Sequence, residues 1–169
     1  KDEMKKVLVF VSSKKIADRL YEAMSEFYIS DLAVIHSNKS QNYRFKSISQ
    51  YNKGKVRILI ATDIIARGLD LDRISHVINF NTPTFAENYM HRIGRTGRVG
   101  EEGNSILFYT ERESYYVNQI ESLMGIKIDK LAIPEQVERT QELTIEEHRE
   151  NGKNVNRNQK KEERENSGF

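Results

Sequence analysis

Apolar residues occur along this chain in short continuous runs, and the segments between the runs carry apolar residues at helical spacing. Runs of strand length that are rich in β-branched residues are typical of strands buried on both faces. Five such runs occur, at residues 6–11, 32–35, 57–61, 76–80 and 105–109. The alternation of strands and helices predicts an α/β fold, with a parallel sheet flanked by helices on both faces.

The intervening segments carry recognisable helix signals. Ser12 or Ser13 can cap a first helix, and Ser40 can open a second that ends at Gly54. Thr84 with Glu87, and Thr110 with Glu113, have the spacing of capping boxes. The apolar faces expected for the first two helices are Ile16, Leu20, Ala23 and Phe27, and Phe45, Ile48 and Tyr51. Residues 62–70 lack a clean amphipathic pattern, which indicates a functional loop.

Composition limits the chain to one domain of ordinary size. It has 169 residues, 37% of them hydrophobic, a net charge of +2 and no cysteine. Neither a disulfide framework nor a thiolate metal site is therefore possible, the histidines lack zinc-ligand spacing, and we expect no bound metal. No apolar run reaches the length of a membrane span, so we expect a cytoplasmic protein without membrane contact. Residues 135–169 contain too few apolar side chains to form a core, so we expect a domain at 1–134 and a flexible polar extension at 135–169.

Polar and charged residues follow each of the first four runs, at the sheet edge where parallel α/β domains bind ligands. The most distinctive segment is His91-Arg92-Ile93-Gly94-Arg95-Thr96-Gly97-Arg98, which has three arginines at a spacing of three. Planar guanidinium groups beside small residues suit a dense anion such as a triphosphate. The alternative is a basic helix end exposed to solvent.

These segments resemble a known family. Residues 61–70 and 91–98 resemble motifs V and VI of DEAD-box ATP-dependent RNA helicases, residues 7–13 resemble motif IV, and residues 41–44 resemble the Gln-x-x-Arg motif. The resemblance covers about residues 6–134 and implies the second, C-terminal RecA-like domain. The run from Ile35 to Gln41 resembles the bacterial RhlE-type branch.

For nucleotide binding, the resemblance implies that Arg95 and Arg98 are catalytic arginine fingers that reach the γ-phosphate of ATP across a cleft between domains. Asp70 matches the carboxylate that accepts a hydrogen bond from the ATP ribose. Arg92 and Asp63 match a pair that braces motif VI against motif V, and His91 matches a residue that faces the first domain.

For RNA, the resemblance implies contacts to the backbone and therefore binding without sequence preference. The matching positions are Thr62, Arg67, Gly68, Arg44, Gln41, Ser13 and Ser37. Ser13 and Ser37 depart from the residues most common in the family. Ser13 has an alternative role as a helix cap, and Arg44 has one as a solvated helix residue.

The sequence contains neither a phosphate-binding loop nor an Asp-Glu-Ala-Asp motif. We therefore expect a piece of a longer ATP-dependent RNA helicase whose N-terminal RecA-like domain binds most of the ATP and Mg²⁺, and we expect this piece to be inactive alone. The alternatives are a stand-alone RNA-binding module without ATPase activity and, with less support, a small nucleotide-binding protein that would need a phosphate loop.

Overall fold

The computed structural model describes residues 4–66, 69, 71, 73–97 and 103–137. Contacts divide the chain into two units, Lys1–Ile128 and Asp129–Phe169, and the fold described below is that of the first unit. The predicted domain boundary at residue 134 stays a prediction.

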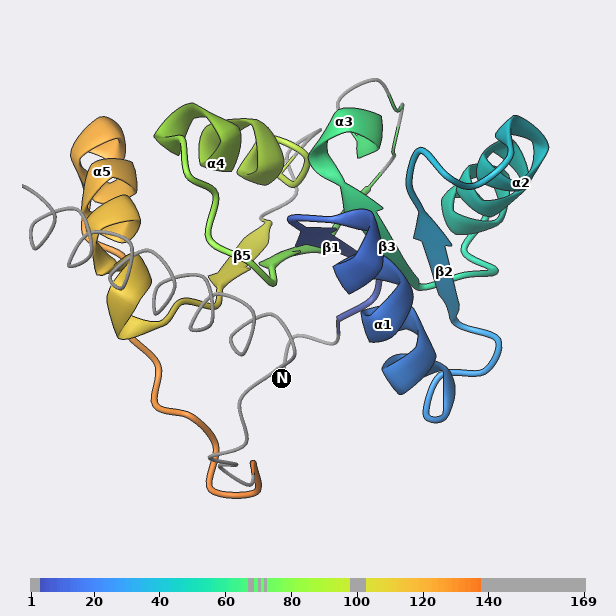
Figure 1. The fold of residues 1–169 in the computed structure, drawn as a ribbon, viewed down its shortest axis with the longest axis horizontal. Helices are drawn as coiled ribbons and strands as arrows, with labels where there is room; N and C mark the ends of the chain where they lie inside the picture. The colour runs from blue at the N-terminus through green and yellow to red at the C-terminus, as the bar shows by residue number, and fades with distance from the viewer. Residues whose placement is uncertain (1–3, 67–68, 70, 72, 98–102, 138–169) are drawn as a thin grey trace, which may run out of the picture. The chain divides into compact units, whose positions relative to one another are not determined.

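The first unit is built on a five-stranded parallel sheet with the order β2-β3-β1-β4-β5 (Figure 1). The strands are β1 (Val7–Val11), β2 (Leu32–Ile35), β3 (Ile58–Thr62), β4 (His76–Asn79) and β5 (Asn104–Leu107). The first three are buried along their whole length, as expected for parallel strands covered on both faces. The predicted fold class is confirmed.

Alternate residues of each central strand face opposite layers of the core. Leu8 and Phe10 of β1 point to the face covered by α2 (Gln41–Asn52) and α3 (Asp63–Ala66). Val9 and its alternate neighbours point to the opposite face, which is covered by α1 (Lys14–Ser25). The sheet is therefore enclosed between two helical layers.

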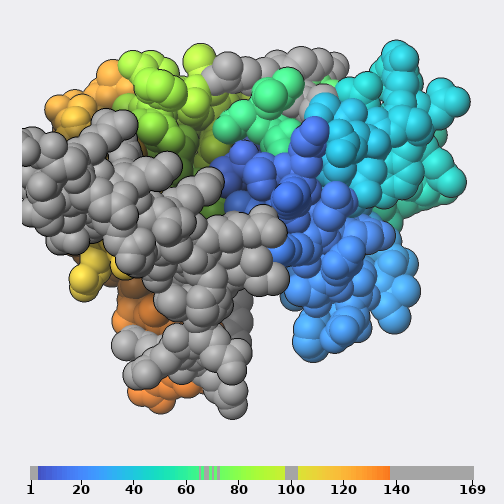
Figure 2. Space-filling view, viewed as in Figure 1, coloured from blue at the N-terminus to red at the C-terminus, as the bar shows by residue number. Residues whose placement is uncertain are grey.

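Two further helices complete the unit. Helix α4 (Ala86–Ile93) lies on the same face as α2 and α3, because its Arg92 reaches Phe10 and Asn79 there. Helix α5 (Ser114–Met124) packs beside α4, after the short 3₁₀ helix η1 (Glu111–Glu113). In the space-filling view, α4, α3 and α2 follow one another along one edge (Figure 2).

Hydrogen bonds at the helix starts confirm three of the four predicted caps. Ser13 Oγ accepts the N–H of Ile16 at 3.2 Å, and Ser40 Oγ accepts that of Tyr43 at 3.3 Å. The Thr110–Glu113 capping box forms before α5. The Thr84–Glu87 box is wrong, because α4 begins one position later than that box requires and Phe85, which has no polar side chain, occupies the cap position.

The predicted apolar faces of the first two helices are partly wrong. Phe27 lies beyond the end of α1 and is 78% exposed, and Ala23 is also exposed; Tyr21 and Met24 pack against the core instead. Phe45 on α2 is 61% exposed, whereas Tyr51 is fully buried. Each residue of an α-helix advances by about 100°, so a repeated spacing of three drifts by about 60° per step and turns Phe45 away from the sheet.

Among the described residues, no helix combines the length and the apolar character that crossing a membrane requires.

Candidate functional site

The candidate site lies at the carboxyl edge of the sheet. Thr62 is the last residue of β3, and Asp63 follows it as the first residue of α3. His91 and Arg92 come from the last turn of α4, and Arg95 follows the end of that helix. Four predicted site residues lie outside the described residues: Arg67, Gly68, Asp70 and Arg98.

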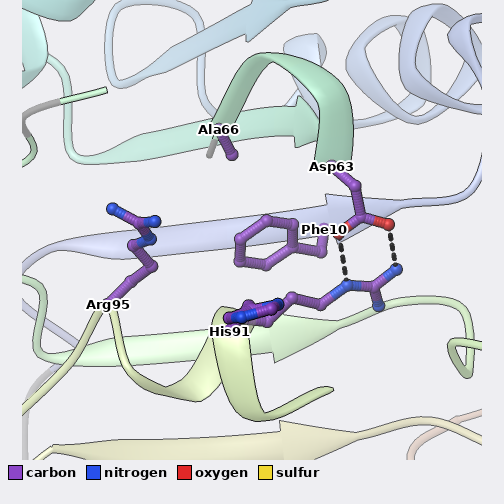
Figure 3. A pocket seen from close by; sticks show the side chains of 6 residues that line it. Phe10, Asp63, Ala66, His91 and Arg95 are labelled. Carbon is purple, nitrogen blue, oxygen red and sulfur yellow. Dashed lines mark hydrogen bonds and ion pairs between the residues drawn. The ribbon is translucent and has the colours of Figure 1, made fainter. Parts of the chain in front are cut away.

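Arg92 is the centre of this site and is only 2% exposed. Its Nε and Nη2 atoms donate to Oδ1 and Oδ2 of Asp63, both at 2.8 Å, which is a two-point contact between a guanidinium and a carboxylate (Figure 3). The structure thus brings together the two residues that the sequence paired across 29 positions.

The other side of the Arg92 guanidinium is held by β4 and β1. Its Nη1 atom donates to Oδ1 of Asn79 at 3.1 Å and to the backbone oxygen of Asn81 at 2.9 Å. The guanidinium carbon lies 5.1 Å from the centre of the Phe10 ring, within the range of a cation–π contact. Arg92 is therefore fixed by β1, by the end of β4 and by α3.

A shallow hollow lies beside this arginine. Its lining residues are Phe10, Asp63, Ala66, His91, Arg92 and Arg95 (Figure 3). Besides Arg92, whose donors bind the protein, the hollow is lined by two residues that carry N–H donors: His91, which is exposed, and Arg95, which is half-buried. Two basic residue types on one wall favour an anionic ligand.

The segment that carries Arg95 is held by contacts of Arg95 itself and of the next residue. Arg95 Nη1 donates to the backbone oxygen of Leu69 at 3.5 Å. The next residue, Thr96, donates through Oγ1 to the backbone oxygen of Ile74 at 2.7 Å and forms a β-bridge with Ile74. These contacts place the end of α4 against the loop that follows α3.

The remaining predicted RNA-binding residues follow β1 and β2 at the same edge. Ser13 is at the start of α1, and its hydroxyl accepts the capping hydrogen bond from Ile16. Ser37 is exposed in the loop between β2 and α2, and Gln41 is exposed as the first residue of α2. Arg44 is half-buried, and its Nε atom has no hydrogen-bond partner among the described residues.

The sequence did not predict the contacts between His36, Asp18 and Lys39, which hold the loop that carries Ser37 between β2 and α2. His36 is 1% exposed, its Nε2 atom lies 2.9 Å from Oδ1 of Asp18 on α1, and its Nδ1 atom accepts the N–H of Asn38. Lys39 Nζ also contacts Asp18, at 2.8 Å. This Lys39 hydrogen bond lowers the pKa of Asp18, with a smaller contribution from His36, and the same hydrogen bond raises the pKa of Lys39.

Asn79, a partner of Arg92, was not predicted as a site residue, and Asn81 was predicted only as one of the polar residues at this edge, without a role. A buried polar residue at the end of an otherwise apolar strand is a usable signal, because burial of an amide requires hydrogen-bond partners. Asn79, which is fully buried at the end of β4, fits that signal.

The parallel sheet, with an arginine-rich helix end at its carboxyl edge, defines a RecA-like α/β domain. Residues 1–100 match the family described as "Helicase conserved C-terminal domain", and the chain belongs to this family.

Proteins similar to this chain include ATP-dependent RNA helicases and DEAD-box proteins. The chain is 40% identical, over 126 residues, to the ATP-dependent RNA helicase DBP2 of Pyricularia oryzae, covering 75% of this chain and 22% of that protein. The crystal structure of a DEAD box protein from Methanococcus jannaschii matches with a TM-score of 0.70 and 39% identity, over 78% of this chain and 36% of that one. Domain 2 of Mss116p, solved bound to an RNA duplex, matches with a TM-score of 0.69 and 30% identity, over 79% of this chain and 54% of that one.

These matches confirm the resemblance to the C-terminal domain of DEAD-box helicases. The chain spans between 22% and 31% of the length of the first curated relatives that it matches.

Proposed function

We propose that this chain is the second RecA-like half of an ATP-dependent RNA helicase. In this proposal it supplies arginine fingers and RNA-backbone contacts to ATP-coupled unwinding of RNA duplexes. The observation that carries the proposal is the buried Arg92–Asp63 pair, which fixes the end of α4 and with it the position of Arg95 beside the hollow. Family membership and the similarity to named RNA helicases support it.

On the ATP side, Arg95 and Arg98 are the proposed catalytic arginines and Asp70 is the proposed ribose contact. Guanidinium groups suit the γ-phosphate because charge develops there in the transition state. His91 would face the N-terminal RecA-like domain of the same protein, which would hold most of the ATP and the Mg²⁺. The basic side chains of His91 and Arg95 beside the hollow support an anionic ligand such as the triphosphate.

On the RNA side, the proposed contacts follow β1, β2 and β3. They are Thr62, Arg67, Gly68, Arg44, Gln41, Ser13 and Ser37. The capping role of Ser13 leaves its hydroxyl hydrogen able to donate to a phosphate, since a hydroxyl can accept and donate at once. The complex of Mss116p domain 2 with an RNA duplex supports RNA as a ligand of this chain. Backbone contacts imply binding without sequence preference.

Two finer assignments belong to the same proposal. The run from Ile35 to Gln41 favours the bacterial RhlE-type branch, and the helicase would act in the cytoplasm.

The test uses a protein that carries this chain together with its N-terminal RecA-like domain. We expect RNA-stimulated ATP hydrolysis, and we expect its rate to fall about 10³-fold in Arg95→Lys. The lysine ammonium cannot make the two parallel hydrogen bonds that a planar guanidinium makes to the phosphate in the transition state. RNA affinity with a non-hydrolysable ATP analogue should be retained. Arg112→Lys, at an exposed arginine of η1, is the matched control and should keep full turnover.

Turnover of Arg95→Lys within a factor of two of the parent would refute the finger assignment. RNA binding without any ATPase activity in the two-domain protein would instead favour the stand-alone RNA-binding module.

A further inference from the structure

Asn81 lies just beyond the end of β4 and uses its backbone and its side chain in two different directions. Its backbone oxygen accepts a hydrogen bond from Arg92 Nη1 at 2.9 Å. Its side-chain Oδ1 accepts the backbone N–H of Ser12 at 3.0 Å, across 69 positions of sequence. One half-buried residue therefore joins the arginine of α4 to the junction between β1 and α1.

The two ends of this connection lie next to the two halves of the proposed site. Arg92 precedes Arg95 by one helical turn, and Arg95 lines the hollow. Ser12 directly precedes Ser13, the cap of α1 and a proposed RNA contact. A shift of the β1–α1 junction would break its hydrogen bond to Asn81, and a shift of Asn81 would disturb Arg92.

The Arg92 end of this connection is held by several hydrogen bonds, whereas the Ser12 end depends on one exposed hydrogen bond. Arg92 is held by Asp63 through two further hydrogen bonds and by Asn79 through one, so the backbone of Asn81 meets a fixed group. The Ser12 end is exposed, where water competes for the N–H. Loss of the Ser12–Asn81 hydrogen bond should therefore release the junction without unfolding the domain.

We propose that Asn81 is a positioning residue that couples the β1–α1 junction to the arginine segment of α4. The inference rests on the proposed function, because it takes Ser13 as an RNA contact and Arg95 as an ATP contact. Binding at either end would then favour the arrangement in which the Ser12–Asn81 hydrogen bond is made. Such coupling is reciprocal, so a nucleotide that binds at Arg95 should strengthen RNA binding by the same factor as RNA strengthens nucleotide binding.

The first experiment measures coupling in the two-domain protein, as the ratio of RNA dissociation constants without and with a non-hydrolysable ATP analogue. Asn81→Leu removes the side-chain acceptor, and we expect the ratio to fall about fivefold, the equivalent of one net hydrogen bond. Asn81→Asp keeps an acceptor for the Ser12 N–H and should retain the ratio within twofold.

Thr82→Val is the matched control. Thr82 is the neighbouring residue, and its Oγ1 donates to the backbone oxygen of Phe108 at 3.1 Å, so the change removes one hydrogen bond that does not reach the junction. We expect a comparable change in thermal unfolding and an unchanged coupling ratio. A merely structural role for Asn81 would instead make the leucine and valine variants alike in both measurements.

The second experiment needs no helicase activity and uses this chain itself. Amide hydrogen exchange at Ser12 should be faster in Asn81→Leu than in the parent and close to the parent rate in Asn81→Asp, because only the aspartate can accept the N–H. Unchanged Ser12 exchange in Asn81→Leu, or an unchanged coupling ratio in that variant, would overturn the inference. A parent protein whose RNA affinity ignores the nucleotide would overturn the proposed function itself, and this is seen before any Asn81 variant is made.

Discussion

Replacement of Asp63 by asparagine tests how strongly the buried arginine organises the site. Asp63 accepts two hydrogen bonds from Arg92, each 2.8 Å long. Asparagine is nearly isosteric with aspartate but carries no charge and can accept only one of the two bonds well. The variant therefore leaves a guanidinium whose side chain is 3% exposed without its counter-ion.

The magnitude follows from the burial of the two partners. Breaking a fully buried ion pair by removing one partner costs about 3–5 kcal/mol of stability. The side chain of Asp63 is 28% exposed, so solvent screens part of the interaction. Arg92 also keeps its bonds to Asn79 and Asn81. We therefore expect Asp63→Asn to lower the free energy of unfolding by about 2–3 kcal/mol.

Urea unfolding of this chain is the appropriate measurement. With a denaturant slope of about 2 kcal/mol per molar, the expected loss moves the midpoint down by about 1–1.5 M. The matched control is Asp31→Asn. Asp31 faces Arg57 at 3.4 Å, with both side chains more than 40% exposed, and should contribute no more than about 0.5 kcal/mol.

A double-mutant cycle with Arg92→Gln separates the pair from its surroundings. We expect a favourable coupling energy between Asp63 and Arg92, because each single variant leaves one charged member of the pair without its partner. If Asp63→Asn shifts the midpoint no further than Asp31→Asn, the buried pair does not organise the site and the reasoning fails.

Three further predictions concern other described residues. The Tyr51 hydroxyl is buried without a hydrogen-bond partner among the described residues, so Tyr51→Phe should leave stability to urea unchanged or raise it by up to about 1 kcal/mol; a larger loss would reveal a hidden partner. Burial also raises the pKa of Tyr51, so the parent should lose more stability than the phenylalanine variant as the pH rises above about 10. The Lys39 hydrogen bond holds the pKa of Asp18 below its ordinary 3.8, so this contribution is present above that value and lost as the pH falls through the lowered pKa. Asp18→Asn should therefore flatten the acid limb of the stability curve below about pH 4, by a small amount because the side chain is 41% exposed. In the two-domain protein, Arg44→Ala should reduce the slope of log affinity against log salt by roughly 0.7 on two unrelated RNA single strands; a loss confined to one sequence would indicate base recognition.

The sheet was predictable from the sequence because a strand buried on both faces must be apolar at nearly every position. The run at Val7–Val11 is such a strand, and β2 and β3 follow the same rule. The buried faces of the helices were less predictable, because an exposed aromatic residue at helical spacing cannot be told from a core residue in the sequence. Phe27 fits the spacing of α1, yet the helix has already ended at Ser25 and the side chain is exposed.

The site was predictable only in part. Its arginines and Asp63 belong to motifs with fixed spacing, so the resemblance identified them and paired Arg92 with Asp63. No such spacing marks Asn81, whose two contacts involve a backbone oxygen and a backbone N–H. Backbone partners carry no side-chain signature, and a single sequence therefore could not indicate that Asn81 joins α4 to the start of α1.

The order of the strands explains why one arginine can collect so many partners. A guanidinium carries five N–H donors in a plane, and when it is buried nearly all of them need acceptors. Strands β3, β1 and β4 are neighbours in the sheet, so Asp63, Phe10 and Asn79 reach the same point at its carboxyl edge. For Arg92 to contact these three residues, the last turn of α4 must lie at the carboxyl edge of the sheet. Arg95 lies only three residues after Arg92. The contacts that hold Arg92 therefore determine the position of Arg95, which is the residue proposed to contact ATP.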